Sequence, residues 1–509
     1  MRLLLVGMNS PRSQNPFLLV LLVVSLLGLL SLLKPGLTVG GVELRPVRLL
    51  ADILRKDPAA VARLDAPPPN GSATVAPADT VAAVATPDSA EVAAEQEVKP
   101  QAPTVPNLGG LDSFLAALRQ TKADGSPVRI AYFGDSMIEG DLITGDLRNS
   151  LQTEFGGAGV GYVPINSITA DFRGTIRQTF SSDWTEYNLV TPKLPAAYPL
   201  GISGHVFLPR PQAPADSMAG PAGQASWVEF RAGGPWAAVR RFEQARLFYG
   251  PGAARDEVLV TTNKHEVAHA LAGGGAVNAM LLKPAVPARS MRLAFATHRP
   301  RPVYGVSFES PRGVVLDNFS FRGNSGLALT RIPFKTLAAF GKELDYRLII
   351  LHYGVNVASA SYASYKWYER GMTRVVDRMQ RAFPNASILI VGMSDKSSRI
   401  DGEFVTDPSV PRLLAAQRQL AVRNHAAFWN LYEAMGGENS MVRWVEDSPA
   451  LANKDYTHVN GRGAHKIAGL LFSYLMQEYA QPSGTPAPAA VRADSAAPRP
   501  AHDSASATR

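Results

Sequence analysis

The chain has 509 residues, of which 46% are hydrophobic, so it is long enough for two to four globular domains with sizeable cores. It contains no cysteine, which excludes disulfides, thiolate metal sites, a cysteine nucleophile and a lipid-modified N-terminal cysteine. The formal net charge of +8 favours an anionic neighbourhood, but no Lys/Arg block interleaved with aromatic residues indicates a nucleic-acid partner.

The N-terminal segment, residues 1–55, contains an uncharged apolar run, FLLVLLVVSLLGLLSLL, at residues 17–33. Its length is at the short end of the range for a membrane-spanning helix. Because Lys34-Pro35-Gly36 follows directly and no small-x-small cleavage site is present, we favour an uncleaved anchor over a cleaved signal peptide. The basic residues on the two sides of the run do not settle its orientation.

Two segments have the composition of disordered chain: residues 56–106, rich in alanine and proline, and the C-terminal tail 481–509. About fifty flexible residues have an r.m.s. reach of about 40 Å. We therefore expect a single-pass protein of the cytoplasmic (inner) membrane. Its folded part, 107–480, would lie in the periplasm or another extracytoplasmic space.

Residues 107–164 and 315–480 alternate short apolar runs with helical stretches. The runs are VRIAYFG (128–134), YRLIILHYG (346–354) and ASILIVGMS (386–394). This alternation predicts an α/β domain, a parallel sheet covered by helices on both faces in three layers.

Residues 165–314 have a different pattern, with short alternating runs such as SWVEFRAG, DEVLVTT and SMRLAFATH, punctuated by glycine and proline. Such runs predict an antiparallel β-sandwich, similar to a jelly roll. Because the segment separates two halves of the α/β pattern, we expect an inserted domain, and carbohydrate binding is a hypothesis for it.

Four polar motifs lie at or near the ends of the predicted α/β strands, where ligands bind in an open α/β sheet. They are GDS (134–136), RGNSG (322–326), YGVN (353–356) and DYTHVNG (455–461). A serine needs a base to become a nucleophile, and the base needs a group that orients it. Asp455 and His458 can supply that pair for Ser136. Backbone N–H groups of Ser136 and Gly326 and the Asn356 amide can stabilise an oxyanion.

Together these motifs resemble the SGNH (GDSL-type) hydrolases over residues 107–160 and 315–480. The matching segments are FGDSMIEGD, RGNSG, YGVN and DYTHVN. By position, the resemblance implies the following roles: Ser136 as nucleophile, His458 as base, Asp455 as its partner, and Ser136, Gly326 and Asn356 as oxyanion donors, with Gly323 as the alternative to Gly326.

Two positions depart from the family pattern. Met137 replaces the usual leucine, and Val357 stands where many members have aspartate, which puts the support of the Asn356 loop in doubt. The arrangement also resembles bacterial cell-wall and polysaccharide O-acetylesterases, some of which carry a β-sandwich insert.

A second motif, His265-Glu266-x-x-His269, has the spacing of a zinc protease. It follows a strand-like run and enters three consecutive glycines, so no long helix is expected there. On a strand, residues four apart are about 13 Å apart, too far to share one zinc ion. We expect a polar edge or turn of the insert and no metal site.

The aromatic segment SYASYKWYER (361–370) follows the Asn356 loop and fits either helix packing or a sugar-stacking rim. The resemblance implies a serine esterase that removes O-acetyl groups from peptidoglycan or another polysaccharide through an acyl-Ser136 intermediate, without a cofactor. An O-acyltransferase with the same residues and a non-catalytic glycan-binding or scaffold protein remain alternatives. The acyl group, the glycan and the oligomeric state stay open.

Overall fold

The computed structural model describes residues 38–39, 42–43, 110–211 and 225–481. The predicted anchor at 17–33, the linker 56–106 and the tail from residue 482 lie outside the described residues. In the first of two units, Met1–Thr80, strand β1 (Thr38–Val39) pairs antiparallel with β2 (Val42–Glu43). Within the described ranges, no helix has the length and apolar character needed to cross a bilayer.

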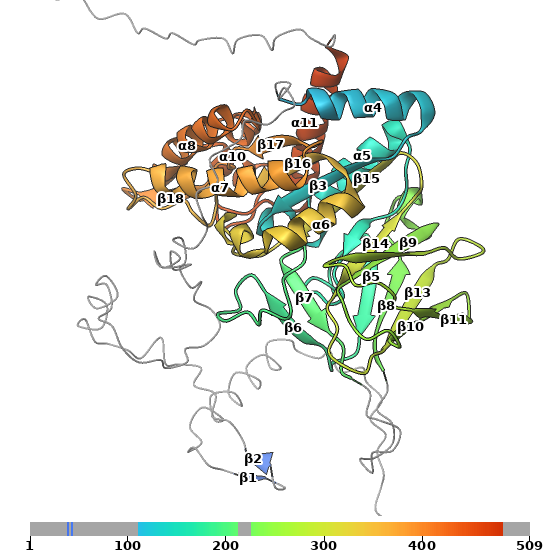
Figure 1. Cartoon of the computed structure of the whole chain (residues 1–509). Coiled ribbons are helices and arrows are strands. Elements are labelled where there is room, and N and C mark those ends of the chain that lie inside the picture. Colours follow the sequence, from blue (N-terminus) through green and yellow to red (C-terminus); the bar gives the residue numbers. More distant parts are fainter. Residues whose placement is uncertain (1–37, 40–41, 44–109, 212–224, 482–509) are drawn as a thin grey trace, which may run out of the picture. The chain divides into compact units, whose positions relative to one another are not determined.

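The second unit contains a five-stranded parallel sheet in the order β15-β3-β16-β17-β20 (Figure 1). The strands are β3 (Val128–Gly134), β15 (Val314–Ser320), β16 (Tyr346–His352), β17 (Ser387–Val391) and β20 (Ala427–Trp429). All seven residues of β3 are buried, because helices cover both faces of the sheet. The predicted parallel sheet is confirmed.

The helices form the two outer layers of this α/β domain. One apolar core joins a sheet face to α4 (Asp112–Asp124), α5 (Thr144–Phe155) and α11 (Gly461–Ala480). The other core joins the opposite face to α6 (Phe334–Leu344), α7 (Lys366–Ala382) and α8 (Ser409–Arg423). The short helices α9 (Leu431–Met435) and α10 (Ser440–Glu446) precede α11.

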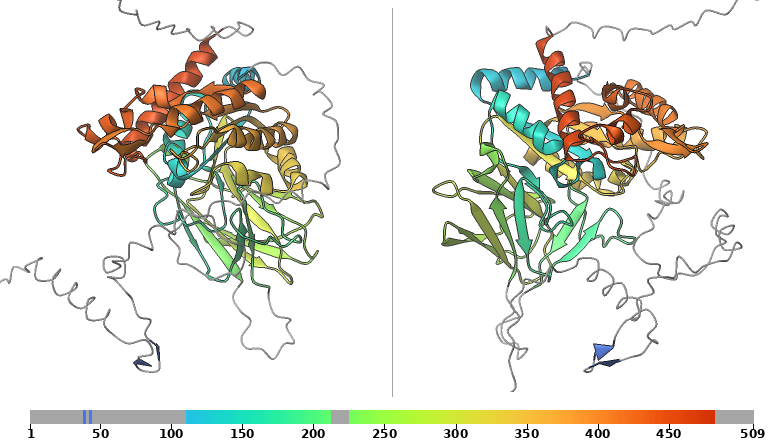
Figure 2. Two further views of the ribbon diagram at one scale, coloured as in Figure 1. Left: turned by 90° about the vertical axis from the view of Figure 1, so that its left-hand side faces the viewer. Right: turned by 180° about the vertical axis from the view of Figure 1, so that it is seen from behind.

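Two antiparallel sheets form the insert, and they lie together beside the α/β domain (Figures 1 and 2). One has the order β11-β10-β13-β8-β5, and the other β12-β9-β14-β7-β6 with β4 on β14. The strands are β4 (Gly161–Val163), β5 (Ile176–Phe180), β6 (Thr185–Asn188), β7 (His205–Leu208), β8 (Ser226–Ala232), β9 (Gln244–Tyr249), β10 (Glu257–Thr262), β11 (His265–Ala270), β12 (Asn278–Leu282), β13 (Ser290–Ala296) and β14 (Val303–Glu309).

Side chains that alternate between buried and partly exposed along β8 and β13 build the core between these sheets, which explains the alternating sequence. Antiparallel sheets were predicted, and the structure contains them. The first strand of the insert, β4, comes before residue 165, because Gly161–Val163 pairs with β14.

A buried ion network joins the parallel sheet to the sandwich. Arg129 of β3 lies 2.8 Å from Asp317 of β15 and also pairs with Glu309 of β14. Asp317 accepts further hydrogen bonds from the Tyr162 N–H at 2.8 Å and the Tyr346 hydroxyl at 2.5 Å. Burial alone would lower the pKa of Arg129, but the two carboxylates raise it above its usual range. The guanidinium therefore stays charged between the two domains.

Candidate active site

Ser136 begins a short 3-10 helix, Ser136–Asp141, directly after β3. Gly134 is required before it, since an added Cβ would lie 2.9 Å from the Ile138 side chain and 3.1 Å from a backbone oxygen of β16. Asp135 is buried, and its Oδ1 caps the helix by accepting a 3.0 Å hydrogen bond from the Met137 N–H. The turn therefore holds Ser136 at the carboxyl end of a central strand.

The structure brings together the three residues predicted as nucleophile, base and orienting group. Ser136 Oγ lies 3.1 Å from His458 Nε2, and His458 Nδ1 lies 2.8 Å from Asp455 Oδ2. The other carboxylate oxygen of Asp455 accepts the backbone N–H groups of Thr457 at 3.0 Å and His458 at 2.9 Å. These distances suit proton transfer from the serine to an oriented imidazole.

The electrostatics of Asp455 agree with this arrangement. Burial alone would raise its pKa, but the hydrogen bonds from the His458 N–H, the His458 ring and the Thr457 N–H lower the pKa below its usual value. The carboxylate is therefore ionised at neutral pH and can stabilise an imidazolium on His458. Both side chains are partly exposed, 49% for Asp455 and 40% for His458, so water can reach the pair.

Asn356 follows β16 and faces the serine turn. Its Nδ2 donates to Asp135 Oδ2 at 2.9 Å and, in a longer contact of 3.3 Å, to the Asn324 carbonyl. Burial raises the pKa of Asp135 to about 6, although the Met137 N–H, His458 and Asn356 partly offset this effect. Asp135, which the motif analysis did not single out, thus positions the Asn356 amide.

The N–H of Gly326, which was predicted as an oxyanion donor, is already hydrogen-bonded within the RGNSG loop. This N–H donates to Asn324 Oδ1 at 2.9 Å, and a Cβ added at Gly326 would lie 2.8 Å from the Met372 sulfur. Gly326 therefore serves close packing against α7. The alternative, Gly323, has no atom within 4 Å of an added Cβ, and no acceptor in the described part of the chain takes its N–H. Of the two glycines, Gly323 is therefore the one whose N–H has no acceptor among the described residues.

A hairpin that the sequence did not reveal supports the histidine loop. It consists of β18 (Ser397–Ile400) and β19 (Glu403–Thr406). The Phe404 ring stacks on Tyr456, with the ring centroids 3.7 Å apart and the planes 9° apart, and the Ser397 N–H donates to the Tyr456 carbonyl at 2.9 Å. Tyr456 adopts a left-handed backbone with φ of +54°, between Asp455 and His458.

The His265-Glu266-x-x-His269 motif belongs to the sandwich and not to the candidate active site. His265 and His269 belong to β11, the edge strand of its sheet, where a strand separates them by about 13 Å. The structure therefore places the motif at a polar edge of the insert. Among the described residues, no group of three or more His, Asp or Glu side chains could hold a metal ion.

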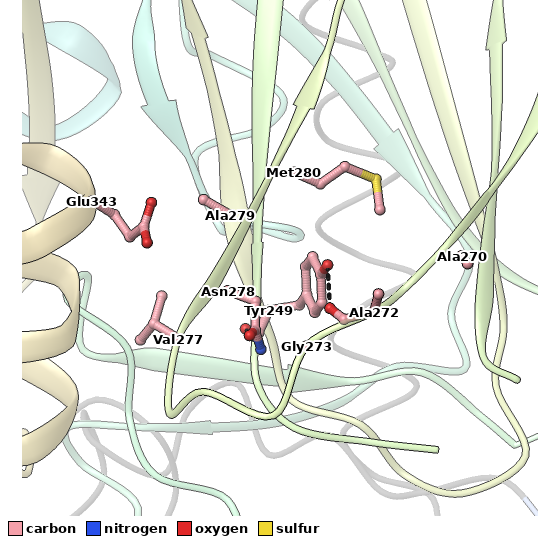
Figure 3. Close-up of a pocket in the computed structure, with 9 residues that line it drawn as sticks. All are labelled: Tyr249, Ala270, Ala272, Gly273, Val277, Asn278, Ala279, Met280 and Glu343. Carbon is pink, nitrogen blue, oxygen red and sulfur yellow. Dashed lines mark hydrogen bonds between the residues drawn. The ribbon is translucent and has the colours of Figure 1, made fainter. Parts of the chain in front are cut away.

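A hollow of about 490 Å³ lies elsewhere, where β9 and β12 of the sandwich face Glu343 of α6 (Figure 3). Its lining includes Tyr249, whose hydroxyl donates to the Ala272 carbonyl at 2.8 Å, and Asn278. None of the residues Ser136, His458 and Asp455 lines this hollow. Its volume alone therefore does not indicate chemistry.

Comparison with known proteins adds to this geometry. No protein-family model matches the sequence, and no curated protein matches it. A solved structure of a peptidoglycan O-acetylesterase aligns over 72% of this chain and 96% of its own, with 20% identity and a TM-score of 0.58. The chain therefore shares the overall fold of that esterase structure. The resemblance inferred from the four motifs is thus confirmed for the fold.

Other solved structures align less closely with this chain. A family two carbohydrate esterase from Clostridium thermocellum, in complex with cellohexaose, aligns over 50% of this chain and 93% of its own, with 9% identity and a TM-score of 0.25. An acetyl xylan esterase aligns over 32% and 81%, with 16% identity and a TM-score of 0.24.

Proposed function

We propose that this protein is a serine esterase that removes O-acetyl groups from peptidoglycan or another polysaccharide. The observation that carries the proposal is the hydrogen-bonded series from Ser136 Oγ through the His458 ring to the Asp455 carboxylate. The SGNH fold, which this chain shares with a peptidoglycan O-acetylesterase, supports the choice of substrate.

In the first half of the reaction, Ser136 Oγ attacks the ester carbonyl carbon while His458 Nε2 takes the hydroxyl proton. Asp455 stabilises the resulting imidazolium. The negative oxygen of the tetrahedral intermediate accepts from the Ser136 N–H, the Gly323 N–H and Asn356 Nδ2, which exchanges its long contact to Asn324 for the oxyanion. Each such donor typically contributes about 3–4 kcal/mol to the transition state.

In the second half, the intermediate collapses and the bond to the sugar oxygen breaks. His458 delivers its proton to that oxygen, so the sugar hydroxyl leaves and an acetyl group remains on Ser136. A water molecule, deprotonated by His458, then attacks the acetyl carbonyl, and acetate leaves as the proton returns to Ser136. The partial exposure of His458 and Asp455 favours water over a sugar hydroxyl as the acceptor.

The proposal extends to location. An anchor at residues 17–33 and the linker 56–106 would hold the catalytic unit outside the cytoplasmic membrane, within reach of a cell-wall polymer. Fractionation of cells and protease accessibility of the intact protein test this part. Protein found only in the soluble cytosolic fraction would contradict it.

The test of the reaction compares the full chain with Ser136→Ala and with a matched control, Ser182→Ala, at an exposed serine of the insert. Acetate release is measured from O-acetylated peptidoglycan and from a small acetate ester. We expect Ser136→Ala to lose at least about a thousandfold in kcat and the control to retain wild-type rates. Equal background rates in all three proteins would refute the esterase. Acetyl transfer to an added glycan in place of water would identify a transferase.

A further inference from the structure

The aromatic segment after Asn356 divides into two buried and two exposed side chains. Tyr365 and Tyr368 are 2% and 1% exposed and pack into the core under α7. Tyr362 and Trp367, by contrast, are 43% and 37% exposed. Helix packing therefore explains only half of this segment.

The two exposed rings are held in place. Tyr362 and Trp367 meet at 60° with their centroids 5.5 Å apart. Tyr362 also contacts the Tyr365 ring at 5.8 Å, and Trp367 contacts the Tyr368 ring at 5.9 Å, both edge to face. The exposed faces thus rest on buried tyrosines and lose little freedom when a ligand binds.

The loop that presents Tyr362 is also fixed, at three consecutive carbonyls. The Ala358 carbonyl accepts from the Lys396 ammonium at 3.4 Å, and the Ser359 carbonyl accepts from the Tyr365 hydroxyl at 3.0 Å. The Ala360 carbonyl accepts from the Arg412 guanidinium at 3.3 Å. These contacts hold the backbone of the loop that carries Tyr362.

These rings lie on elements that are connected to the candidate active site. Asn356 begins the same loop, at the carboxyl end of β16. The Tyr368 hydroxyl donates to the Ser325 carbonyl at 3.0 Å, and Ser325 lies in the RGNSG loop that carries Gly323. Two elements that supply proposed oxyanion donors therefore support the aromatic surface directly.

The geometry points to Tyr362 and Trp367 as a subsite for a pyranose ring of the polysaccharide whose ester is cleaved. A pyranose has an apolar face of C–H groups and a rim of hydroxyls. The aromatic faces fit the former, and two serine hydroxyls of the same loop, at Ser359 and Ser361, which lie 2.7 Å apart, fit the latter. This inference rests on the proposed function for the identity of the glycan.

The test measures binding and turnover separately in the full chain. Ser136→Ala is titrated calorimetrically with peptidoglycan fragments, alone and combined with Trp367→Ala, Trp367→Phe or Tyr362→Ala. A control, Val422→Ala, removes a side chain of α8 that is 64% exposed. We expect about tenfold weaker binding for Trp367→Ala, the size associated with losing one aromatic face, with partial recovery in Trp367→Phe.

In proteins that keep Ser136, the kcat/KM for the polymer should fall about tenfold more than that for a small acetate ester in Trp367→Ala. Equal losses on both substrates would overturn the subsite, because they indicate a disturbed Asn356 loop. Unchanged glycan affinity would overturn it as well. If no ester is turned over but Trp367→Ala still weakens glycan binding, the esterase proposal fails and the subsite stands.

Discussion

Replacing Asp317 with asparagine tests the buried ion network between the parallel sheet and the sandwich. The substitution keeps the shape of the side chain but removes the charge that faces Arg129, and it places an amide where the Tyr162 N–H and the Tyr346 hydroxyl now donate. The Arg129 side chain is 7% exposed and would retain only Glu309 as a charged partner. Breaking such a buried pair costs about 3–5 kcal/mol in the free energy of unfolding.

The expected change in melting temperature follows from the size of the folded part. Unfolding entropy is about 2.1 cal/mol/K per residue, so the roughly 360 residues of the second unit that the structure describes give about 0.8 kcal/mol/K. A loss of about 3–5 kcal/mol then lowers the melting temperature by about 4–7 °C. Differential scanning calorimetry and circular dichroism melts measure it directly.

The matched control is Asp377→Asn. Its carboxylate pairs with Arg381 at 3.4 Å, but both side chains are more than half exposed, so the melting temperature should change by less than about 1 °C. An equally small change for Asp317→Asn would refute the reasoning, because the network would then contribute nothing to the junction.

Two further predictions concern the site itself. Because burial raises the folded-state pKa of Asp135 to about 6, from 3.8, its contribution to stability is present at low pH and is lost as pH rises from about 4 to 6. The free energy of unfolding of the wild type, relative to Asp135→Asn, should therefore fall over that window by up to about 1.4 kcal/mol per pH unit in urea titrations; a flat difference would contradict the raised pKa. The substitution Phe404→Ala removes the ring that stacks on Tyr456. Because about 1 kcal/mol of stacking that holds the His458 loop is lost, kcat should fall about five- to tenfold, with little change in melting temperature. Ile400→Ala, on the same hairpin, should leave kcat unchanged, and equal kinetics in the two variants would exclude the positioning role of Phe404.

Much of the fold could be predicted because the relevant signals are local. The buried strand β3 contains the apolar run Ile130–Phe133, and alternating burial leaves a polar–apolar pattern in β8 and β13. The pairing of Asp455 with His458 could also be predicted, because the two residues are only three positions apart on one loop, where the carboxylate can reach the imidazole.

The choice between two glycines in RGNSG could not be predicted, because it depends on where a side chain between them turns. Asn324 accepts the N–H of Gly326 and leaves that of Gly323 free of protein acceptors in the described ranges. The hairpin beside Tyr456 was missed because its ring stacking joins segments far apart in the chain. The anchor and the linker stay predictions, since they lie outside the described residues.

The position of the sandwich within the chain has a consequence for folding. The parallel sheet must join β3 to β15, and Arg129 and Asp317 on these strands are 188 residues apart. Contacts of such separation are slow to form, because the loop between them must first be closed at an entropic cost. The antiparallel pairing of β4 with β14 brings Val163 beside Val306, so a sandwich that folds first has already closed most of that loop. Folding of the insert first would therefore bring β3 and β15 close together before they pair.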